Sequence, residues 1–323
     1  MFKSIVLFSS LLVVTFALSD VEVAQEWKQF LETSKKVYQS PKEEAKRLGI
    51  FRENLKKIEA HNKIFNEGKV TYKLGVTKFT DLTPEEFLEY VHKDKVLPSI
   101  KADEVFKANP NFTAPGSVDW RKQAKLFVKD QGQCGSCWSF STTGAIEAHY
   151  YIARRQAVSL SEQNLIDCAT SQYGNNGCNG GNYNGAFDYV KENGIDTESN
   201  YPYRAQQGSC NQRSTAVKIS GYSNVNGDEN SIQQAVASKG PVSIAIDASS
   251  ELQNYHSGVL DDGTCTSNVN HAVLAVGYGE ENGSPFWIIK NSWGSNWGEN
   301  GYYRLVRNRS ACGITTMPSY PRI

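Results

Sequence analysis

The chain has 323 residues, with 34 basic and 34 acidic side chains, so its formal charge is zero. This length is enough for one large or two modest domains with a real core. The balanced charge argues against nucleic acid or an anionic membrane as a partner, and we expect neither.

The first residues have the pattern of a secretory signal peptide. Lys3 precedes an apolar run over residues 5–18, and the small residues Ala17 and Ser19 form a cleavage pattern. A membrane anchor is the alternative, but the run is too short for a full span, and no later stretch is apolar enough. We therefore predict a signal peptide at residues 1–19 and a product that follows the secretory pathway.

Residues 20–113 differ in character from residues 114–323. The first segment has 17 basic and 16 acidic residues among 94, against 16 and 18 among 210 in the second, and it lacks cysteine. About twice the charge density predicts a helical, solvated module. The breaker-rich joint at 108–116 predicts an exposed boundary and a processing site, with a mature N-terminus near Ala114.

One helix face is predicted within this first module. An ordinary amphipathic helix is the alternative, but the mixture of Glu, Arg and Asn suggests a helix that hydrogen-bonds a partner element. Trp27 and Phe30 imply an earlier helix, and Thr83 followed by Pro84 predicts the cap and first residue of a later one. The face, whose members fall within a ~100° arc, consists of Glu43, Arg47, Phe51, Asn54, Ile58 and Asn62.

Residues 131–140 hold two cysteines three positions apart, Cys134 and Cys137, before an apolar run. This pattern predicts a loop that enters a helix with Cys137 in its first turn, where backbone N–H groups favour a thiolate. Three interpretations remain open at this point: a structural pair, a redox Cys-x-x-Cys, and a nucleophile beside a disulfide-bonded cysteine.

The chain has seven cysteines, none before residue 134. In an oxidising compartment three bridges would leave one thiol, and six cysteines allow fifteen pairings, so spacing cannot assign them. A single Cys-x-x-Cys without a second pair is a poor metal motif. We expect no metal and no cofactor.

The second segment is predicted to be α+β, with a helical half before a β-rich half. A short helix capped by Ser161 should end at Cys168, and the glycine-rich loop 177–181 offers bare backbone to an extended ligand. A cleft between two such halves is the default place for a site. Strands are expected at 242–248, 272–278, 286–290 and 301–306.

A thiol nucleophile needs a base, a group that orients the base, and donors for the oxyanion. Among the histidines after residue 114, His149 lies too far along the Cys137 helix, and His256 lies in a polar stretch. His271 opens an apolar strand, where a lone histidine is more often structural. A catalytic role for His271 is favoured by Asn291, whose side-chain oxygen can accept a hydrogen bond from one imidazole nitrogen.

Two further residues complete this group. Trp293 can shield the His–Asn contact from water, although core packing is the alternative. Gln131, six residues before Cys137, can donate to an oxyanion alongside the Cys137 backbone N–H.

Together these motifs resemble the papain-like cysteine proteases of the cathepsin L type. The first segment is similar to the inhibitory propeptide of that group, although Thr77 stands where the second propeptide motif has asparagine. The motifs are Gln131, Cys134-Gly135-Ser136-Cys137-Trp138, Gly177-Cys178-Asn179-Gly180-Gly181, Asn270-His271-Ala272-Val273 and Asn291-Ser292-Trp293-Gly294, with Gly75, Thr77, Phe79 and Asp81 in the first segment.

The resemblance implies a fold and an activity. The fold is two-lobed, with a helical left lobe, a β-barrel-like right lobe and a cleft between them, preceded by a mostly helical propeptide. The domains are the signal peptide 1–19, the propeptide 20–113 and the peptidase 114–323. The activity is that of a cysteine protease that is made as a zymogen and processed at acid pH. We expect an endopeptidase because the paired histidines of an exopeptidase loop are not visible.

The resemblance also implies roles for single residues. Cys137 is the nucleophile, His271 the base and then acid, Asn291 the orienting group, and Gln131 the oxyanion donor. The redox interpretation then fails, because Cys134 has another partner. The implied bridges are Cys134–Cys178, Cys168–Cys210 and Cys265–Cys312.

Substrate contacts follow in the same way. Gly180 and Gly181 hold the substrate backbone, and Trp293 borders the site. The pocket for the second residue before the cut prefers Leu or Val over Phe. Its uncharged lining is formed by Tyr183, Ala245, Val269 and Met317.

Partners and destination are expected from the same resemblance. The partners are protein and peptide substrates, the chain's own propeptide and cystatin-like inhibitors, and the enzyme is a monomer that is lysosomal or secreted. Glycosylation sequons begin at Asn111, Asn282 and Asn308. Two rival functions are a catalytically dead binding protein and a protease inhibitor that acts in trans. The presence of Cys137, His271, Asn291 and Gln131 argues against the first, and the covalent link of the first segment to an intact protease argues for control in cis.

Overall fold

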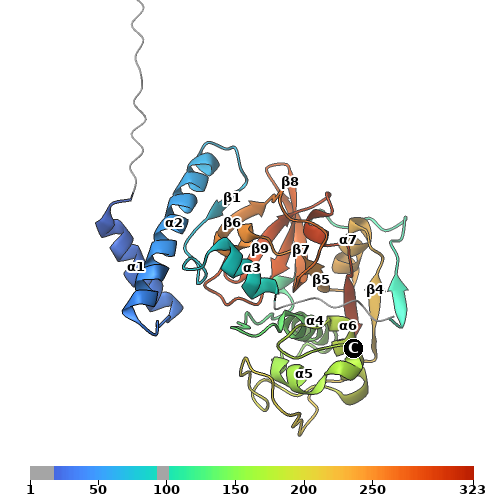
Figure 1. The fold of residues 1–323 in the computed structure, drawn as a ribbon. Helices are drawn as coiled ribbons and strands as arrows, with labels where there is room; N and C mark the ends of the chain where they lie inside the picture. The colour runs from blue at the N-terminus through green and yellow to red at the C-terminus, as the bar shows by residue number, and fades with distance from the viewer. Residues whose placement is uncertain (1–17, 93–101) are drawn as a thin grey trace, which may run out of the picture.

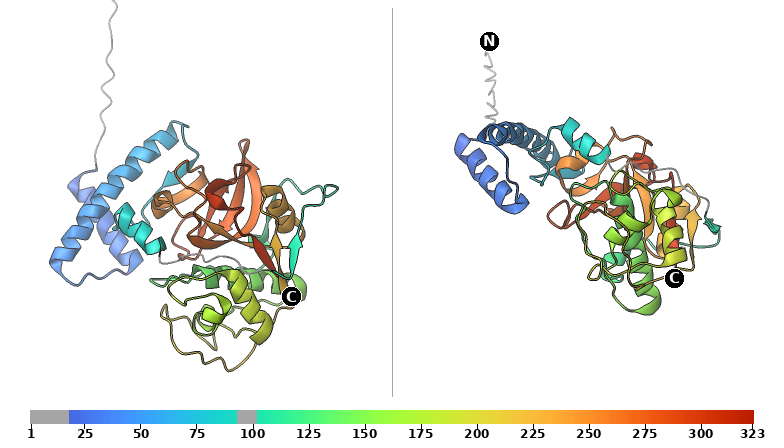
Figure 2. Two further views of the ribbon diagram at one scale, coloured as in Figure 1. Left: turned by 45° about the vertical axis from the view of Figure 1, so that its right-hand side comes forward. Right: turned by 60° about the horizontal axis from the view of Figure 1, so that its bottom comes forward.

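The computed structural model describes residues 18–92 and 102–323 (Figure 1). Most of the predicted signal peptide therefore lies outside the described residues. Figures 1 and 2 show a helical N-terminal module beside two lobes, one with helices and one with most of the strands. The predicted α+β, two-lobed fold is confirmed. Below, "N-terminal module" means residues 20–113 and "C-terminal segment" means residues 114–323.

The described helices are α1 (Asp20–Ser34), α2 (Pro41–Asn66), α3 (Pro84–His92), α4 (Cys137–Arg154), α5 (Glu162–Cys168), α6 (Tyr183–Asn193) and α7 (Glu229–Ser238). The described strands are β1 (Tyr72–Leu74), β2 (Glu104–Phe106), β3 (Val118–Asp119), β4 (Gly221–Val225), β5 (Val242–Ile246), β6 (Tyr255–Leu260), β7 (His271–Glu281), β8 (Ser284–Lys290), β9 (Tyr302–Val306) and β10 (Ser319–Arg322).

The N-terminal module is built on the packing of α1 against α2. The ring centroid of Phe30 lies 5.3 Å from that of Trp27 and 5.0 Å from that of Phe51. Ser40 caps α2 and Pro41 stands at its start, where its missing N–H costs nothing. The earlier helix that the aromatic residues predicted is therefore present.

The polar residues of α2 bind the chain that follows it. The Asn54 side-chain nitrogen donates to the carbonyls of Thr80 and Leu82 at 2.7 and 2.8 Å. Asn62 exchanges two hydrogen bonds with the backbone of Leu74. The prediction that this helix hydrogen-bonds a partner element is confirmed.

One sheet runs through both parts of the chain. Its strand order is β1-β6-β9-β8-β7-β5-β10-β4-β2, with β3 paired to β7. The N-terminal module supplies both outer strands: β1 lies antiparallel to β6, and β2 lies parallel to β4. Figure 1 shows β2 at the opposite side of the molecule from α1 and α2. The module thus covers both edges of the sheet that the C-terminal segment forms.

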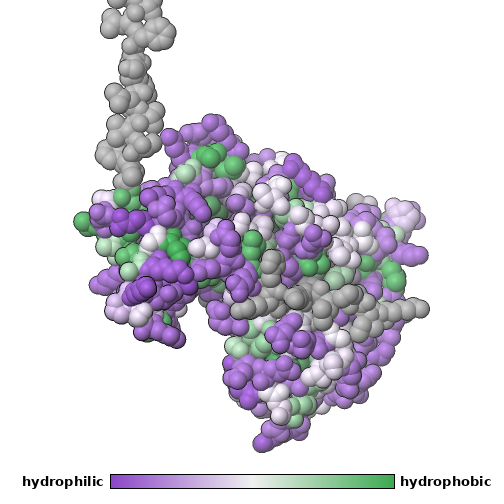
Figure 3. Space-filling model, viewed as in Figure 1, coloured by the Kyte–Doolittle hydropathy of each residue, from purple (hydrophilic) through white to green (hydrophobic). Residues whose placement is uncertain are grey.

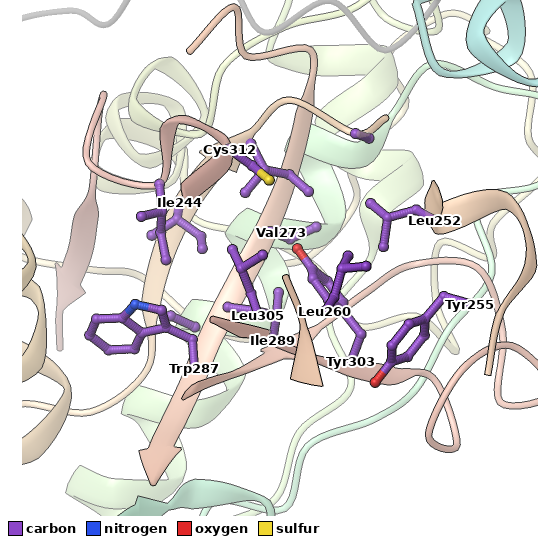
Figure 4. Packing of buried hydrophobic residues seen from close by; sticks show 14 of the residues in the cluster. Ile244, Leu252, Tyr255, Leu260, Val273, Trp287, Ile289, Tyr303, Leu305 and Cys312 are labelled. Atoms are coloured by element: carbon purple, nitrogen blue, oxygen red, sulfur yellow. The ribbon is translucent and has the colours of Figure 1, made fainter. Parts of the chain in front are cut away.

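The two lobes have separate cores. In the helical lobe α4 is buried from Cys137 to His149. In the strand-rich lobe, Figure 4 shows Ile244, Val273 and Trp287 among the side chains that converge between the strands. The helices α6 and α7 and the strands β1, β2, β3, β4, β6 and β10 were not predicted, and the predicted strand at 272–278 extends over 271–281.

The surface is mostly polar on the face that Figure 3 shows, with small apolar patches over α1 and α2. Among the described residues, no helix combines the length and apolar character that a membrane crossing needs. Within the same residues, His, Cys, Asp and Glu side chains nowhere gather in threes as a metal site would require.

Candidate active site

Cys137 is the first residue of α4, as its position before an apolar run predicted. The helix packs against β7, and the backbone N–H of Ala272 donates to the Cys137 sulfur at 3.2 Å. A helix N-terminus and an N–H donor both stabilise negative charge, so this environment favours the thiolate. Ser136, the residue before the helix, directs its hydroxyl to Tyr203 instead of capping α4.

The remaining cysteines form three disulfides, and Cys137 is the cysteine outside them. The first disulfide ties the loop before α4 to the glycine-rich loop and thereby separates the two members of the Cys-x-x-Cys. The pairs are Cys134–Cys178, Cys168–Cys210 and Cys265–Cys312.

His271 and Asn291 are brought together by strand pairing. His271 begins β7 and Asn291 follows β8, and these strands run antiparallel with Leu274 opposite Lys290. The His271 Nε2 and Asn291 Oδ1 atoms lie 2.8 Å apart.

This contact also fixes the imidazole tautomer. Asn291 Oδ1 accepts from the backbone N–H of Ser292 at 2.8 Å, so this atom is the oxygen and not the amide nitrogen. His271 Nε2 must therefore carry the proton that it donates, and Nδ1 is left as the basic nitrogen of a neutral ring.

Trp293 covers the His–Asn pair. Its ring stacks on His271 with centroids 4.9 Å apart and planes at 25°. Trp297 meets Trp293 edge-on at 4.9 Å, and both indoles are buried. Shielding from water strengthens the His271–Asn291 hydrogen bond. Cys137 and His271 are themselves fully buried in this form of the chain.

Gln131 is held in one orientation in the loop before Cys137. Its Nε2 donates to the Cys134 carbonyl at 3.0 Å, and its Oε1 accepts from the Ser292 hydroxyl at 2.6 Å. These two contacts leave no ambiguity about which end is the nitrogen. An amide nitrogen carries two N–H groups, which suits it to oxyanion stabilisation. Ser292 has no role in the sequence prediction, although it lies within a quoted motif.

The glycine-rich loop is packed too closely for side chains. A Cβ added at Gly181 would lie 2.6 Å from Asn175 Oδ1 and 2.8 Å from the Trp138 ring. Gly180 has φ +101°, a left-handed conformation that side chains disfavour, and its N–H donates to the Gly135 carbonyl. The loop is therefore held against Cys134 and Gly135, the segment just before Cys137.

The four residues expected to line the substrate pocket lie in the same core cluster as Cys137. Tyr183 and Ala245 are buried, and Val269 and Met317 are partly buried. The Tyr183 hydroxyl donates to the Met317 carbonyl at 2.6 Å, and Ala245 in β5 pairs with Ala272 in β7. Burial, together with the charge of Cys137, raises the pKa of Tyr183 well above its ordinary value.

The other histidines lie outside this group. His149 is buried, with its Nε2 at 2.9 Å from the Pro241 carbonyl, and burial lowers its pKa to about 4. His256 is exposed on β6. The three sequon residues lie apart from the site at exposed positions, Asn111, Asn282 and Asn308.

The N-terminal module covers the Trp293 side of the site. Phe79 and Phe87 meet the Trp293 ring edge-on at 5.2 and 5.7 Å. Thr77, which replaces the usual asparagine, donates from its hydroxyl to the Gln253 carbonyl at 2.6 Å. The Tyr90 hydroxyl donates to the Gly132 carbonyl. The module therefore covers both Trp293 and the loop that carries Gln131.

A buried ion cluster supports α4 and was not predicted. Lys129 Nζ lies 2.7 Å from Glu162 and 2.9 Å from Glu147. Burial by itself would lower the pKa of Lys129, but Glu162 and Glu147 together raise it above its ordinary value. Burial lowers the pKa of Lys290, the residue before Asn291, to about 8. Charged residues scattered along the sequence gave no signal of this grouping.

Two family profiles match the sequence. Residues 114–322 match the papain family cysteine protease profile, and residues 27–87 match the cathepsin propeptide inhibitor domain.

Individual relatives agree with these matches. Cathepsin L of Sarcophaga peregrina is 44% identical over 331 aligned positions, which cover 97% of each chain. Cathepsin L1 of Drosophila melanogaster is 46% identical, over 97% of this chain and 89% of that one. The structure of digestive procathepsin L 3 from the larval midgut of Tenebrio molitor superposes with a TM-score of 0.89 at 48% identity, over 93% of this chain and 99% of that one.

Proposed function

The chain belongs to the papain family of cysteine proteases, and we propose that it hydrolyses peptide bonds through Cys137, His271 and Asn291. The family membership and the inhibitory module make it a cathepsin L-like cysteine endopeptidase that is made as a zymogen. The observation that carries the residue assignment is the His271–Asn291 contact of 2.8 Å beside a cysteine at a helix N-terminus.

In the proposed acylation step, His271 Nδ1 takes the thiol proton and the Cys137 thiolate attacks the scissile carbonyl. Negative charge develops on the carbonyl oxygen and is stabilised by the Gln131 amide and the Cys137 backbone N–H. The imidazolium then gives its proton to the leaving amine, the C–N bond breaks, and a thioester remains.

In the proposed deacylation step, His271 accepts a proton from water, whose oxygen attacks the thioester carbonyl. The C–S bond breaks and the acid product leaves, while the thiolate–imidazolium pair is restored. Asn291 acts throughout by holding the imidazole in the tautomer that presents Nδ1.

We propose that the second residue before the cut is Leu or Val. Tyr183, Ala245, Val269 and Met317 are uncharged, and the Tyr183 side chain is tied to the Met317 backbone. A rigid apolar pocket favours a branched aliphatic residue of matching size. A panel of dipeptide substrates that varies this residue tests the proposal, and a preference for Arg would contradict it.

Processing and destination form the rest of the proposal. Residues 1–19 are the signal peptide, 20–113 the propeptide and 114–323 the mature enzyme, which is released at acid pH and is a lysosomal or secreted monomer. Protein substrates and cystatin-like inhibitors occupy the same cleft as the propeptide. Sequencing the mature N-terminus tests the boundary near Ala114.

The catalytic assignment is tested on the acid-activated enzyme with a dipeptide–coumarin substrate. Cys137→Ala should abolish hydrolysis, and His271→Gln should lower kcat/KM by at least about 10³-fold, because a base and a nucleophile act as one unit. His256→Gln is the matched control and should retain wild-type activity. A correctly processed wild-type protein without activity would favour a binding role instead.

A further inference from the structure

Asp130 is a charged residue next to Gln131 and Trp293, and neither the sequence motifs nor the proposed mechanism gives it a role. It precedes Gln131 in the chain and forms a β-bridge with Trp293. Its Oδ1 accepts from the backbone N–H of Gly132 at 2.9 Å. On the other side, a Cβ at Gly294 would lie 3.0 Å from its Oδ2, so the carboxylate is held between two backbone segments.

The position of Asp130 assigns it to one side of the scissile bond. In the proposed mechanism His271 protonates the leaving amine, and Trp293 stacks on His271. The glycine-rich loop, in contrast, is bound to Gly135 before the nucleophile. Because Asp130 flanks Trp293, it faces the part of the substrate that leaves with the amine.

The N-terminal module places a cation on this carboxylate. Lys78 Nζ lies 2.6 Å from Asp130 Oδ1, and its ammonium also lies 5.1 Å from the centre of the Phe79 ring. Asp130 nevertheless keeps 46% of its side-chain surface exposed. A carboxylate that remains accessible in the closed form will be accessible to a substrate when Lys78 leaves.

A cavity of about 330 Å³ adjoins this ion pair, between the module and the Trp293 wall. Of the described residues that line it, Asp130 is the one charged side chain from the C-terminal segment, and the module contributes two cations, Lys35 and Lys78. The other lining residues of the C-terminal segment are Trp293, Gly294, Ser295, Asn296 and Trp297. Without the module, the side of the cavity that the C-terminal segment forms is therefore acidic and aromatic.

We propose that Asp130 selects substrates with Lys or Arg in the first two positions after the scissile bond. Lys78 occupies the place of that side chain in the zymogen, so the inhibitory module uses the same charge complementarity as a substrate. The inference rests on the proposed function, because it needs His271 to act on the leaving-group side.

The size of the effect follows from the exposure of the site. Solvent-accessible ion pairs are weak, which predicts a preference of about two- to fivefold for a basic over a neutral residue. The preference should shrink as ionic strength rises, since salt screens exposed charges. Glu at the same position should be disfavoured by a similar factor.

The test uses mature enzyme whose active fraction has been titrated with an epoxide that alkylates the catalytic thiol. Internally quenched peptides share Leu at the second residue before the cut and carry Lys, Gln or Glu at the first or second residue after it. At pH 5.5 and low salt, the wild-type kcat/KM for Lys should exceed that for Gln at one of these positions by about two- to fivefold. The ratio should approach one in Asp130→Asn, whereas Asp261→Asn, an exposed carboxylate that pairs with Arg309, should keep the wild-type ratio.

Two results would overturn the inference: a wild-type ratio of one at both positions, or a lysine preference that persists in Asp130→Asn. The salt dependence of the wild-type ratio gives a second measurement that does not depend on the variant folding. A dipeptide–coumarin substrate has no amino acid after the cut, so its turnover reports the proposed function alone. Turnover of that substrate without a lysine preference would reject only the role of Asp130.

Discussion

The N-terminal module holds the C-terminal segment at two places with opposite chemistry. The aromatic anchor, Phe79, Phe87 and Tyr90, is buried against Trp293 and the loop before Cys137. The charged strap, residues 102–109, lies along β4 with largely exposed side chains.

The strap is held by backbone pairing with β4 and by ion pairs. Asp103 lies 2.7 Å from Lys191, and Arg322 lies 2.6 Å from Glu104. Burial of aromatic surface does not depend on protonation, whereas exposed ion pairs are individually weak and need ionised carboxylates. Closure of the site and attachment of the strap are therefore separate properties of the zymogen, and acid should loosen the strap first.

The largest expected effect is on the anchor. Phe79→Ala removes a buried ring between the module and Trp293, which should cost about 3–5 kcal/mol. If the module closes the site through this ring, the open fraction of the zymogen should rise roughly 10²-fold or more, at 1.4 kcal/mol per factor of ten. The rate at which a thiol-reactive epoxide labels Cys137 in the zymogen at neutral pH measures that fraction.

Phe112→Ala is the matched control for this change. Phe112 lies in the joint after the strap and is 36% exposed, so its loss should alter labelling by less than about twofold. Labelling of Phe79→Ala at the wild-type rate would mean that the anchor does not close the site.

A smaller effect is expected from the helix that supports the anchor. Asn54→Ala leaves the buried carbonyl of Thr80 without its side-chain donor, whereas the carbonyl of Leu82 keeps a hydrogen bond from Gln253, so the cost should be about 1–3 kcal/mol. The epoxide should then label Cys137 faster than in wild type but more slowly than in Phe79→Ala. Asn66→Ala, at an exposed position at the end of α2, should leave the rate unchanged; an equal rise in both variants would point to general loss of helix stability.

Part of this arrangement could be predicted from the sequence. The face of α2, its cap and its use of asparagines could be foreseen because helical spacing is local and the polar residues on it were unusual. The residues of the proposed catalytic group could be selected from the sequence because each lies in a short motif. The first turn of α4 and the start of β7 are both visible as changes in apolar pattern.

The partners in space could not be foreseen. β2 is three residues long, lies between the charged residues Asp103 and Lys107, and pairs with a strand more than a hundred residues later, so no alternation of apolar and polar residues predicts it. Lys78–Asp130 and the cluster of Lys129, Glu147 and Glu162 are long-range ion pairs between ordinary charged residues. Such contacts depend on tertiary packing, which overrides local propensity.

A weak effect is expected from the strap at neutral pH. Arg322→Gln removes its ion pairs with Glu104 and Asp103, and exposed pairs contribute only about 0.2–1 kcal/mol each. Amide hydrogen exchange over residues 104–109 should accelerate by no more than about fivefold, with no change in the labelling of Cys137. Arg309→Gln, which breaks an exposed pair elsewhere, should change neither. Faster labelling of Cys137 in Arg322→Gln would show that strap and anchor act together.

The smallest effect is the contribution of one carboxylate as the pH falls. The hydrogen bond from Lys191, followed by the charges of Lys191 and Arg322, holds the pKa of Asp103 below its usual value despite some burial. A carboxyl group with a depressed pKa stabilises the folded form above its unfolded pKa of about 3.9 and loses that contribution as the pH drops through the folded value. In a Cys137→Ala zymogen, which cannot digest itself, exchange over residues 104–109 should therefore accelerate below about pH 4, after correction for intrinsic rates. Asp103→Asn should remove part of this pH dependence, and the amides of β1 should stay protected to lower pH than those of β2. Loss of protection at both strands at the same pH would mean that acid releases the module as one unit, and the distinction between anchor and strap would fail.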